Sequence, residues 1–409
     1  MPLRPPHFPF FSPLLPLAAL VPLLAACHSA PGAMASGARR EANPLMSGAH
    51  DAAAATEKTF SILWWAKVEG TQERPYHPVE LASPAVDARR GLVFTATRDG
   101  YLTAFSQATR ERIWEVKLDG PFNAGPLMDA SGSLLSREVL YVASAGGKLE
   151  ALEPGTGKNI WSYSTPEAFM TMPVAAGDLI LVMTAADTLV ALDKRTGVWR
   201  WQYKRDMPSS LSLFGAARPA VKDGRVYAGF ADGYAVALDL SGGALLWEKE
   251  LSRAKAFRDL DASPVIDAQG NVLFTSGSDG LFCLDGGTGD IKWSHLRPGL
   301  TAAILNASGD RVFVGGQSFV AMLETASGRM RWARDLRTGT AVTALANASG
   351  QLIASCGADP MVFIEEETGR VRREFQPGYG VTAPASVTED GDLFVLSNRG
   401  YLYALGIHP

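Results

Sequence analysis

The sequence is poor in cysteine and histidine, with three and six of them among 409 residues. So few cysteines argue against a disulfide framework, and Cys283 and Cys356 are expected to be buried free thiols. The histidines are scattered singly, which argues against a histidine metal site. The formal net charge is −4, so the basic surface of a nucleic-acid-binding protein is missing. No GxSxG, Walker-type or HExxH motif occurs either.

The longest apolar run lies at the N-terminus. Residues 8–26 carry no charge and follow a single basic residue, Arg4, as in a signal peptide. The run ends in Leu-Ala-Ala before Cys27, which resembles a bacterial lipobox, so we expect residues 1–26 to be removed and Cys27 to be lipidated. An uncleaved membrane anchor is the alternative, because 19 residues can just span a bilayer, but four prolines in the run weaken it.

The segment after this cysteine is rich in Ala, Gly and Ser. Residues 28–58 contain no aromatic side chain and cannot bury enough apolar surface to fold. We therefore expect residues 27–59 to be a flexible tether, about 30 Å in root-mean-square length, that holds a folded body off a membrane. His28 stands where enterobacterial lipoproteins retained in the inner membrane have aspartate, which favours a lipid anchor in the outer membrane, facing the periplasm.

From residue 60 onward the chain repeats. Tryptophans recur at intervals of about 44 residues, so residues 60–409 hold about eight units. Each unit has an Asp-Gly or similar turn between alternating strands, then a Thr-Gly or similar turn before an aromatic residue. Four antiparallel strands per unit are typical of a β-propeller blade, so the predicted fold is all-β, an eight-bladed β-propeller. The recurring tryptophans are Trp114, Trp161, Trp201, Trp247, Trp293 and Trp332.

The two ends of the repeat region complement each other. The last unit stops after its third strand, near Leu405, whereas residues 60–68 have the pattern of a fourth strand with no blade before it. Pairing the two would complete the eighth blade and remove an open sheet edge. Trp64 and Phe375 then fill the two remaining aromatic positions. A seven-bladed ring is the alternative, but it would leave one end of the region unpaired.

The pattern Ala-Leu-Asp-x-x-Thr-Gly-x-x-x-Trp, which ends at Trp201, resembles the PQQ-like repeat of quinoprotein propellers. PQQ-dependent dehydrogenases of that type need a quinone pocket, a Ca²⁺ site, an Asp base and often an adjacent Cys-Cys pair. This chain has no such pair and no long insertion that could form a substrate lid, so we expect no catalytic residue, cofactor or metal. Asp99, Asp232 and Asp279 are expected to be structural turn residues. A PQQ-dependent dehydrogenase-like protein remains the alternative.

Two connections break the repeat, at residues 205–219 and 252–264. Each joins a fourth strand to the first strand of the next unit, so they should lie on one face of adjacent blades. The first offers apolar side chains and the second offers carboxylates, a combination typical of protein-binding surfaces. The alternative is that the leucines of the first connection only close the end of the propeller.

These connections carry a closer resemblance. Met-Pro-Ser followed by Leu-Ser-Leu, and Asp-x-Asp-x-x-Pro one blade later, are similar to the loops of the BamB family, the propeller lipoproteins of the outer-membrane β-barrel assembly machine. The resemblance implies a non-catalytic scaffold that binds the periplasmic POTRA domains of BamA and other subunits of the machine, with unfolded outer-membrane proteins as further partners. The positions that match the family's partner-binding residues are Leu211, Leu213, Asp259 and Asp261, and Phe214 is expected to join them as an apolar residue of the first connection. Phe214 replaces the family's Arg, so Arg218 or Arg258 would have to supply the salt bridge to BamA. A propeller lipoprotein scaffold that binds a different envelope partner is a further alternative.

Overall fold

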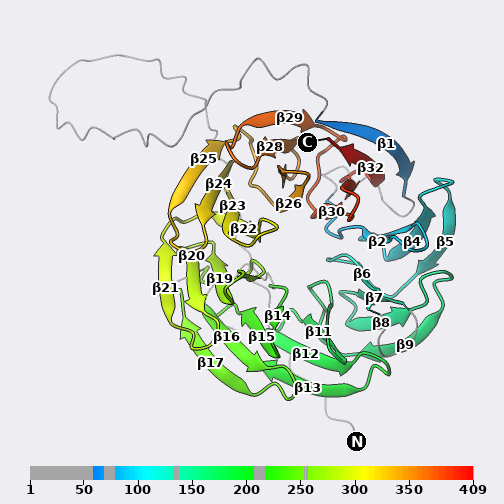
Figure 1. Cartoon of the computed structure of the whole chain (residues 1–409). Helices are drawn as coiled ribbons and strands as arrows, with labels where there is room; N and C mark the ends of the chain where they lie inside the picture. Colours follow the sequence, from blue (N-terminus) through cyan, green and yellow to red (C-terminus); the bar gives the residue numbers. More distant parts are fainter. Residues whose placement is uncertain are drawn as a thin grey trace, which may run out of the picture. The chain divides into compact units, whose positions relative to one another are not determined.

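A computed structural model describes residues 59–68, 79–131, 138–206, 217–252, 254 and 257–408. Within this part of the chain, 32 strands form eight four-stranded antiparallel sheets arranged in a ring (Figure 1). None of the described residues is helical. The predicted eight-bladed β-propeller is therefore confirmed. Blades 1 to 7 each contain four consecutive strands, beginning with β2, and blade 8 combines β30, β31 and β32 with β1.

The second and third strands of each blade carry most of the core, whereas several of the innermost strands are only half-buried. The innermost strands are β2 (Ala85–Asp87), β6 (Leu127–Asp129), β10 (Val174–Ala176), β14 (Ala220–Lys222), β18 (Val265–Ile266), β22 (Leu300–Leu305), β26 (Ala344–Ala348) and β30 (Ser386–Val387). The second strands, which are almost entirely buried, are β3 (Leu92–Ala96), β7 (Val139–Ala143), β11 (Leu179–Met183), β15 (Arg225–Gly229), β19 (Asn271–Ser276), β23 (Arg311–Gly316), β27 (Gln351–Ser355) and β31 (Asp392–Leu396). Neighbouring blades cover both faces of these strands, which explains their continuous apolar sequences.

The two outer strands lead from the core to the rim. The third strands, again mostly buried, are β4 (Tyr101–Ser106), β8 (Lys148–Leu152), β12 (Thr188–Asp193), β16 (Tyr234–Asp239), β20 (Gly280–Asp285), β24 (Phe319–Glu324), β28 (Met361–Glu365) and β32 (Tyr401–Ile407). The outermost strands are β5 (Arg112–Lys117), β9 (Asn159–Ser164), β13 (Trp199–Lys204), β17 (Leu245–Glu250), β21 (Ile291–His295), β25 (Met330–Asp335), β29 (Val371–Phe375) and β1 (Phe60–Lys67). The outermost strands are mostly exposed or half-buried, because one face meets solvent.

A tryptophan on the outermost strand joins each of six blades to the next. The Trp161 indole N–H donates to the Lys194 carbonyl at 3.2 Å, and its ring covers Gly197. Gly197 has a φ of +72°, and a Cβ there would lie 2.4 Å from Trp161 Cε3, so the turn glycine serves both backbone and packing. The indole–carbonyl pairs are Trp114–Pro154, Trp161–Lys194, Trp201–Leu240, Trp247–Gly286, Trp293–Thr325 and Trp332–Glu366.

The ring closes as predicted, by pairing the two ends of the repeat region. Strand β1 pairs antiparallel with β32, with Trp64 opposite Ala404. The Phe60 ring at the start of β1 lies edge-on to Phe375 of blade 7, with ring centroids 5.4 Å apart. Blade 8 is thus assembled from both ends of the described chain, and no blade in it lacks a fourth strand.

The propeller has two different faces. The turns between second and third strands and the blade-to-blade connections share one of them, which we call the connection face. There the Leu251 N–H donates to the Gly233 carbonyl at 2.9 Å, which places the end of β17 beside the β15–β16 turn. The Thr-Gly turns lie on the opposite, terminal face, where the described chain begins and ends: the His408 N–H donates to the Thr59 carbonyl at 2.9 Å.

Candidate partner-binding surface

The described ends of the two irregular connections lie on the connection face of adjacent blades, as the sequence predicts. The first follows β13 and leads into blade 4, and the second follows β17 and leads into blade 5 (Figure 1). Three predicted partner-binding residues, Leu211, Leu213 and Phe214, lie outside the described residues, as does Cys27. Asp259 and Asp261 are described and can be placed.

Leu260 anchors the second connection in the core. Its side chain is buried between blades 4 and 5, and its N–H donates to the Phe230 carbonyl at 3.2 Å. A Cβ on Gly229 would lie 2.6 Å from Leu260 Cβ, so the glycine opens the space that the leucine fills. Sequence reasoning missed this residue, although an apolar residue between two aspartates is a signal for such an anchor. The same backbone bond recurs at Phe122–Thr97, Phe169–Ser144 and Val342–Gly316.

The two aspartates on either side of Leu260 differ in their exposure to solvent. Asp259 is only 2% exposed, whereas Asp261 is half-buried and reaches solvent. Burial raises the pKa of Asp261, and the negative Asp259 raises it further, against the opposing effect of its own backbone N–H. In the unbound chain, therefore, Asp261 is the carboxylate available to a partner, and Asp259 lies beneath it.

Arg205 fixes the beginning of the first connection. Its Nε lies 2.6 Å from Asp232 Oδ2 and its Nη1 lies 2.6 Å from Glu248 Oε2. Its guanidinium also stacks on the Tyr234 ring, 4.4 Å from the centroid. These contacts outweigh burial and raise the pKa of Arg205. Asp232 also accepts the Tyr234 N–H at 3.1 Å, so it is a turn residue as expected and, in addition, the partner of a connection residue.

The two arginines considered as substitutes for the family's Arg differ in position. The Arg258 Nε donates to the Asp232 carbonyl at 2.7 Å, and Arg258 Nη2 lies 3.7 Å from Glu250 Oε1, so this guanidinium is bound within the chain. Arg218 ends the first connection, and its N–H donates to Ser263 Oγ at 3.1 Å. Burial lowers the pKa of Arg218. The ends of the two connections are therefore tied to each other through Arg218.

A buried carboxylate lies in the β11–β12 turn, next to Arg205 at the start of the first connection. Asp187 occupies the β11–β12 turn with a φ of +53°, and its Oδ2 accepts the Ala231 N–H at 2.9 Å. Burial raises its pKa to about 6, and the negative Asp232 and Asp259 add to this. Sequence reasoning missed Asp187; the signal was a turn in which aspartate replaces the usual glycine.

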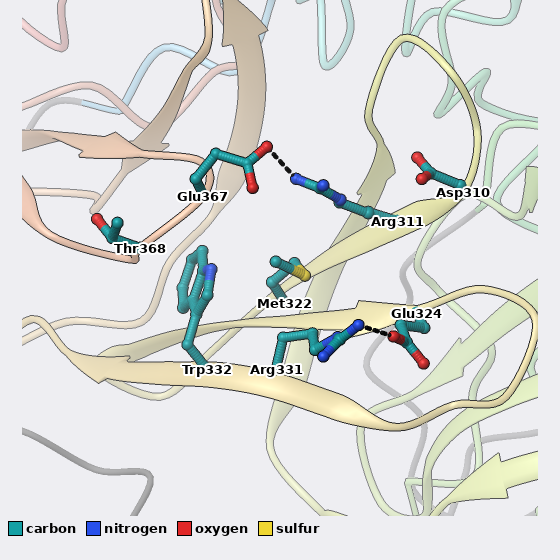
Figure 2. A pocket seen from close by; sticks show the side chains of 8 residues that line it. All are labelled: Asp310, Arg311, Met322, Glu324, Arg331, Trp332, Glu367 and Thr368. Atoms are coloured by element: carbon teal, nitrogen blue, oxygen red, sulfur yellow. Dashed lines mark hydrogen bonds and ion pairs between the residues drawn. The ribbon is translucent and has the colours of Figure 1, made fainter.

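Other features of the described residues lie apart from this surface. Figure 2 shows a cavity of about 460 Å³ on the terminal face between blades 6 and 7, beside the Trp332 ring. Two ion pairs line it, Arg311 with Glu367 and Arg331 with Glu324. No predicted site residue lines this cavity.

In the described part of the chain, no group of three or more His, Cys, Asp or Glu side chains is placed to hold a metal ion, and no helix is long and apolar enough to cross a bilayer. Cys283 and Cys356 are buried free thiols, as predicted, and burial raises the pKa of each to about 12.

Comparison with known proteins identifies the family. The family model described as "Outer membrane protein assembly factor BamB" matches residues 98–302 and 294–408. The chain belongs to this family. The BamB of Shewanella oneidensis is 24% identical over 333 residues, which cover 78% of this chain and 83% of that protein.

Solved structures agree on the fold. BamB from Moraxella catarrhalis matches with a TM-score of 0.70 at 20% identity, covering 85% of this chain and all of that one. The quinohemoprotein alcohol dehydrogenase of Comamonas testosteroni matches with a TM-score of 0.65 at 13% identity, covering 89% and 79%. Since a BamB and a dehydrogenase both share this propeller, the propeller alone does not distinguish an assembly factor from an enzyme.

Proposed function

We propose that this chain is a non-catalytic, lipid-anchored scaffold of the outer-membrane β-barrel assembly machine, which binds the periplasmic POTRA domains of BamA through its connection face. The observation that carries the proposal is the pair of irregular connections on adjacent blades, tied together by the Arg218–Ser263 bond, in a chain of the BamB family. Its partners would be BamA, other subunits of the machine and unfolded outer-membrane proteins. Its place would be the periplasmic side of the outer membrane.

The two connections would contribute in different ways. Leu211, Leu213 and Phe214 would supply the apolar anchors that carry most of the binding energy of such an interface. Asp261 would fix the orientation of the partner through its charge, because complementary charges determine register more than affinity. Asp259 and Leu260 would hold Asp261 in place from below, and Arg205 would hold the start of the apolar connection.

The position of the chain's entry point fits an anchored scaffold. Thr59 lies on the terminal face, opposite the connections. A lipid on Cys27 and a tether of residues 27–59 would therefore hold the propeller by the terminal face and leave the connection face free for a partner.

A paired substitution tests the proposed function. We expect Leu211→Asp with Leu213→Asp to abolish co-purification of BamA with this chain from detergent-solubilised envelopes, because two buried charges would replace the apolar anchors. The matched control is Leu245→Asp with Leu246→Asp, an exposed leucine pair at the terminal-face end of β17. BamA retained by the first variant, or lost equally from both, would contradict the proposed site.

A further inference from the structure

Two exposed apolar side chains on the connection face have no role in the fold. Leu296, directly after β21, is 72% exposed, the highest value among the large apolar side chains of the described residues. Phe257, in the second connection, is 45% exposed and has a φ of +56°. A phenylalanine with positive φ is strained, and this one is not repaid by burial. Folding therefore does not explain either residue at its position.

Contacts link Leu296 to the connection that holds Phe257. Ser252 and Arg258 of that connection both lie against Gly233, where a Cβ would be 2.8 Å from the Ser252 carbonyl oxygen and 3.2 Å from the Arg258 carbonyl oxygen. Ser252, at the start of the connection that holds Phe257, lies 3.2 Å from Ser278 in the β19–β20 turn, Oγ to Oγ. Ser278 Oγ donates to Asp279 Oδ2 at 2.6 Å. The next residue is Gly280, where a Cβ would lie 3.1 Å from Leu296 Cα. Leu296 thus lies beside the β19–β20 turn, to which the half-buried Asp279 carboxylate belongs, and the connection that holds Phe257 reaches the same turn through Ser252.

We infer that Phe257, Asp279 and Leu296 form a second contact strip for the same partner, continuing the proposed interface from blades 3 to 5 toward blade 6. This inference rests on the proposed function. The strip fits a protein surface on which a Lys or Arg side chain is flanked by apolar side chains. Continuity favours this occupant, because Phe257 belongs to the same connection as Asp261. An anionic membrane surface fits poorly, since the charge within the strip is a carboxylate.

The test titrates the purified full chain in detergent with the purified, fluorescently labelled periplasmic region of BamA from the same organism. Phe257→Asn with Leu296→Ser should weaken binding about tenfold or more, since it removes two apolar anchors. Asparagine tolerates positive φ, and both side chains are exposed, so the melting temperature should not change. Asp279→Asn should weaken binding several-fold and reduce its salt dependence. Ile113→Ser is the control, because Ile113 is similarly exposed but lies on β5 at the rim.

The outcomes separate this inference from the function on which it rests. If the unsubstituted chain binds, Leu211→Asp with Leu213→Asp abolishes binding and the Phe257/Leu296 variant binds like the unsubstituted chain, the strip is refuted and the proposed function stands. If the unsubstituted chain does not bind, both fall. If the strip variant changes only the self-association of the chain, measured by sedimentation, then the occupant is a second copy and the inference is wrong.

Discussion

A glycine under each of six tryptophans sets how closely two blades approach. At Gly197 the positive φ and the contact with the Trp161 ring both exclude a side chain, whereas Gly224 has almost the same φ, +73°, with nothing near its missing Cβ. A substitution at Gly224 therefore tests backbone strain alone, whereas one at Gly197 tests backbone strain together with packing. The Thr-Gly turn that marks the repeat in the sequence is, in the structure, the surface on which the neighbouring tryptophan rests.

Gly197→Ala should destabilise the propeller by about 2–4 kcal/mol, since it adds a clash with the Trp161 ring to the strain of a left-handed alanine. Gly224→Ala should cost about 1–2 kcal/mol, from strain alone. Urea unfolding of both variants measures the difference. Equal losses would show that the ring contact does not restrict this glycine.

Asp187 should make stability depend on pH. Its pKa in the folded chain is about 6, above the ordinary value of 3.8, so folding favours the neutral form. The associated stability is complete below about pH 4 and is lost as the pH rises through 6. Asp187→Asn should therefore be more stable than the unsubstituted chain by about 3 kcal/mol at pH 8, with the difference vanishing near pH 4. Chemical unfolding at the two pH values provides the measurement.

Asp129 is a control for Asp187, because its pKa is shifted in the opposite direction. Burial would raise its pKa, but hydrogen bonds from Lys194 and Ser131 outweigh burial and lower it. Its stabilising effect is present above the ordinary pKa and is lost as the pH falls. Asp129→Asn should thus destabilise the chain at pH 8 and matter less in acid. The same pH response from both variants would contradict the assigned environments.

The residues that recur in every repeat unit could be predicted from the sequence. Buried residues that occur in only one unit could not. The tryptophans and turn glycines recur in nearly every unit. The role of such a residue in one unit therefore predicts its role in the others. Asp187 and Leu260 act through a neighbouring blade, and their burial depends on how two sheets pack. For the same reason the sequence could not distinguish the buried Asp259 from the accessible Asp261.

At the scale of elements, β1 determines whether the ring is closed. The sequence predicted a closing strand over residues 60–68, and the structure has it at Phe60–Lys67. The prediction succeeded because a strand without a blade and a blade without a strand stood at opposite ends of one repeat region. The conformations of the irregular connections, which follow no repeat, could not be predicted in this way.

Trp64 and Trp65 are adjacent on β1 and test its packing. Trp64 is 8% exposed and lies in a cluster that joins blade 8 to blade 1, whereas Trp65 is 59% exposed. Trp64→Ala should cost about 3–5 kcal/mol and promote aggregation through the loosened β32 edge. Trp65→Ala should cost under about 1 kcal/mol. Thermal unfolding and light scattering measure both, and a milder effect at Trp64 than at Trp65 would argue against closure by β1.

At the scale of the whole molecule, the two faces have different tasks in the proposed function. The terminal face holds the entry point of the chain, and the connection face holds both irregular connections and the strip of Phe257, Asp279 and Leu296. The rigid ring would keep these elements at fixed positions relative to one another. Because dehydrogenases share the ring, the function of this chain is expected to depend on its connections.

Site-specific photo-cross-linking in living cells tests the central claim most directly. A cross-linking amino acid at Leu213 in the first connection, or at Asp261 in the second, should form an adduct with BamA. The same group at Val198, which is 60% exposed on the terminal face of blade 3, should form none. Adducts with BamA at Val198 alone, or no BamA adduct at either position in the connections, would contradict the proposal that this propeller binds its partner through its connections.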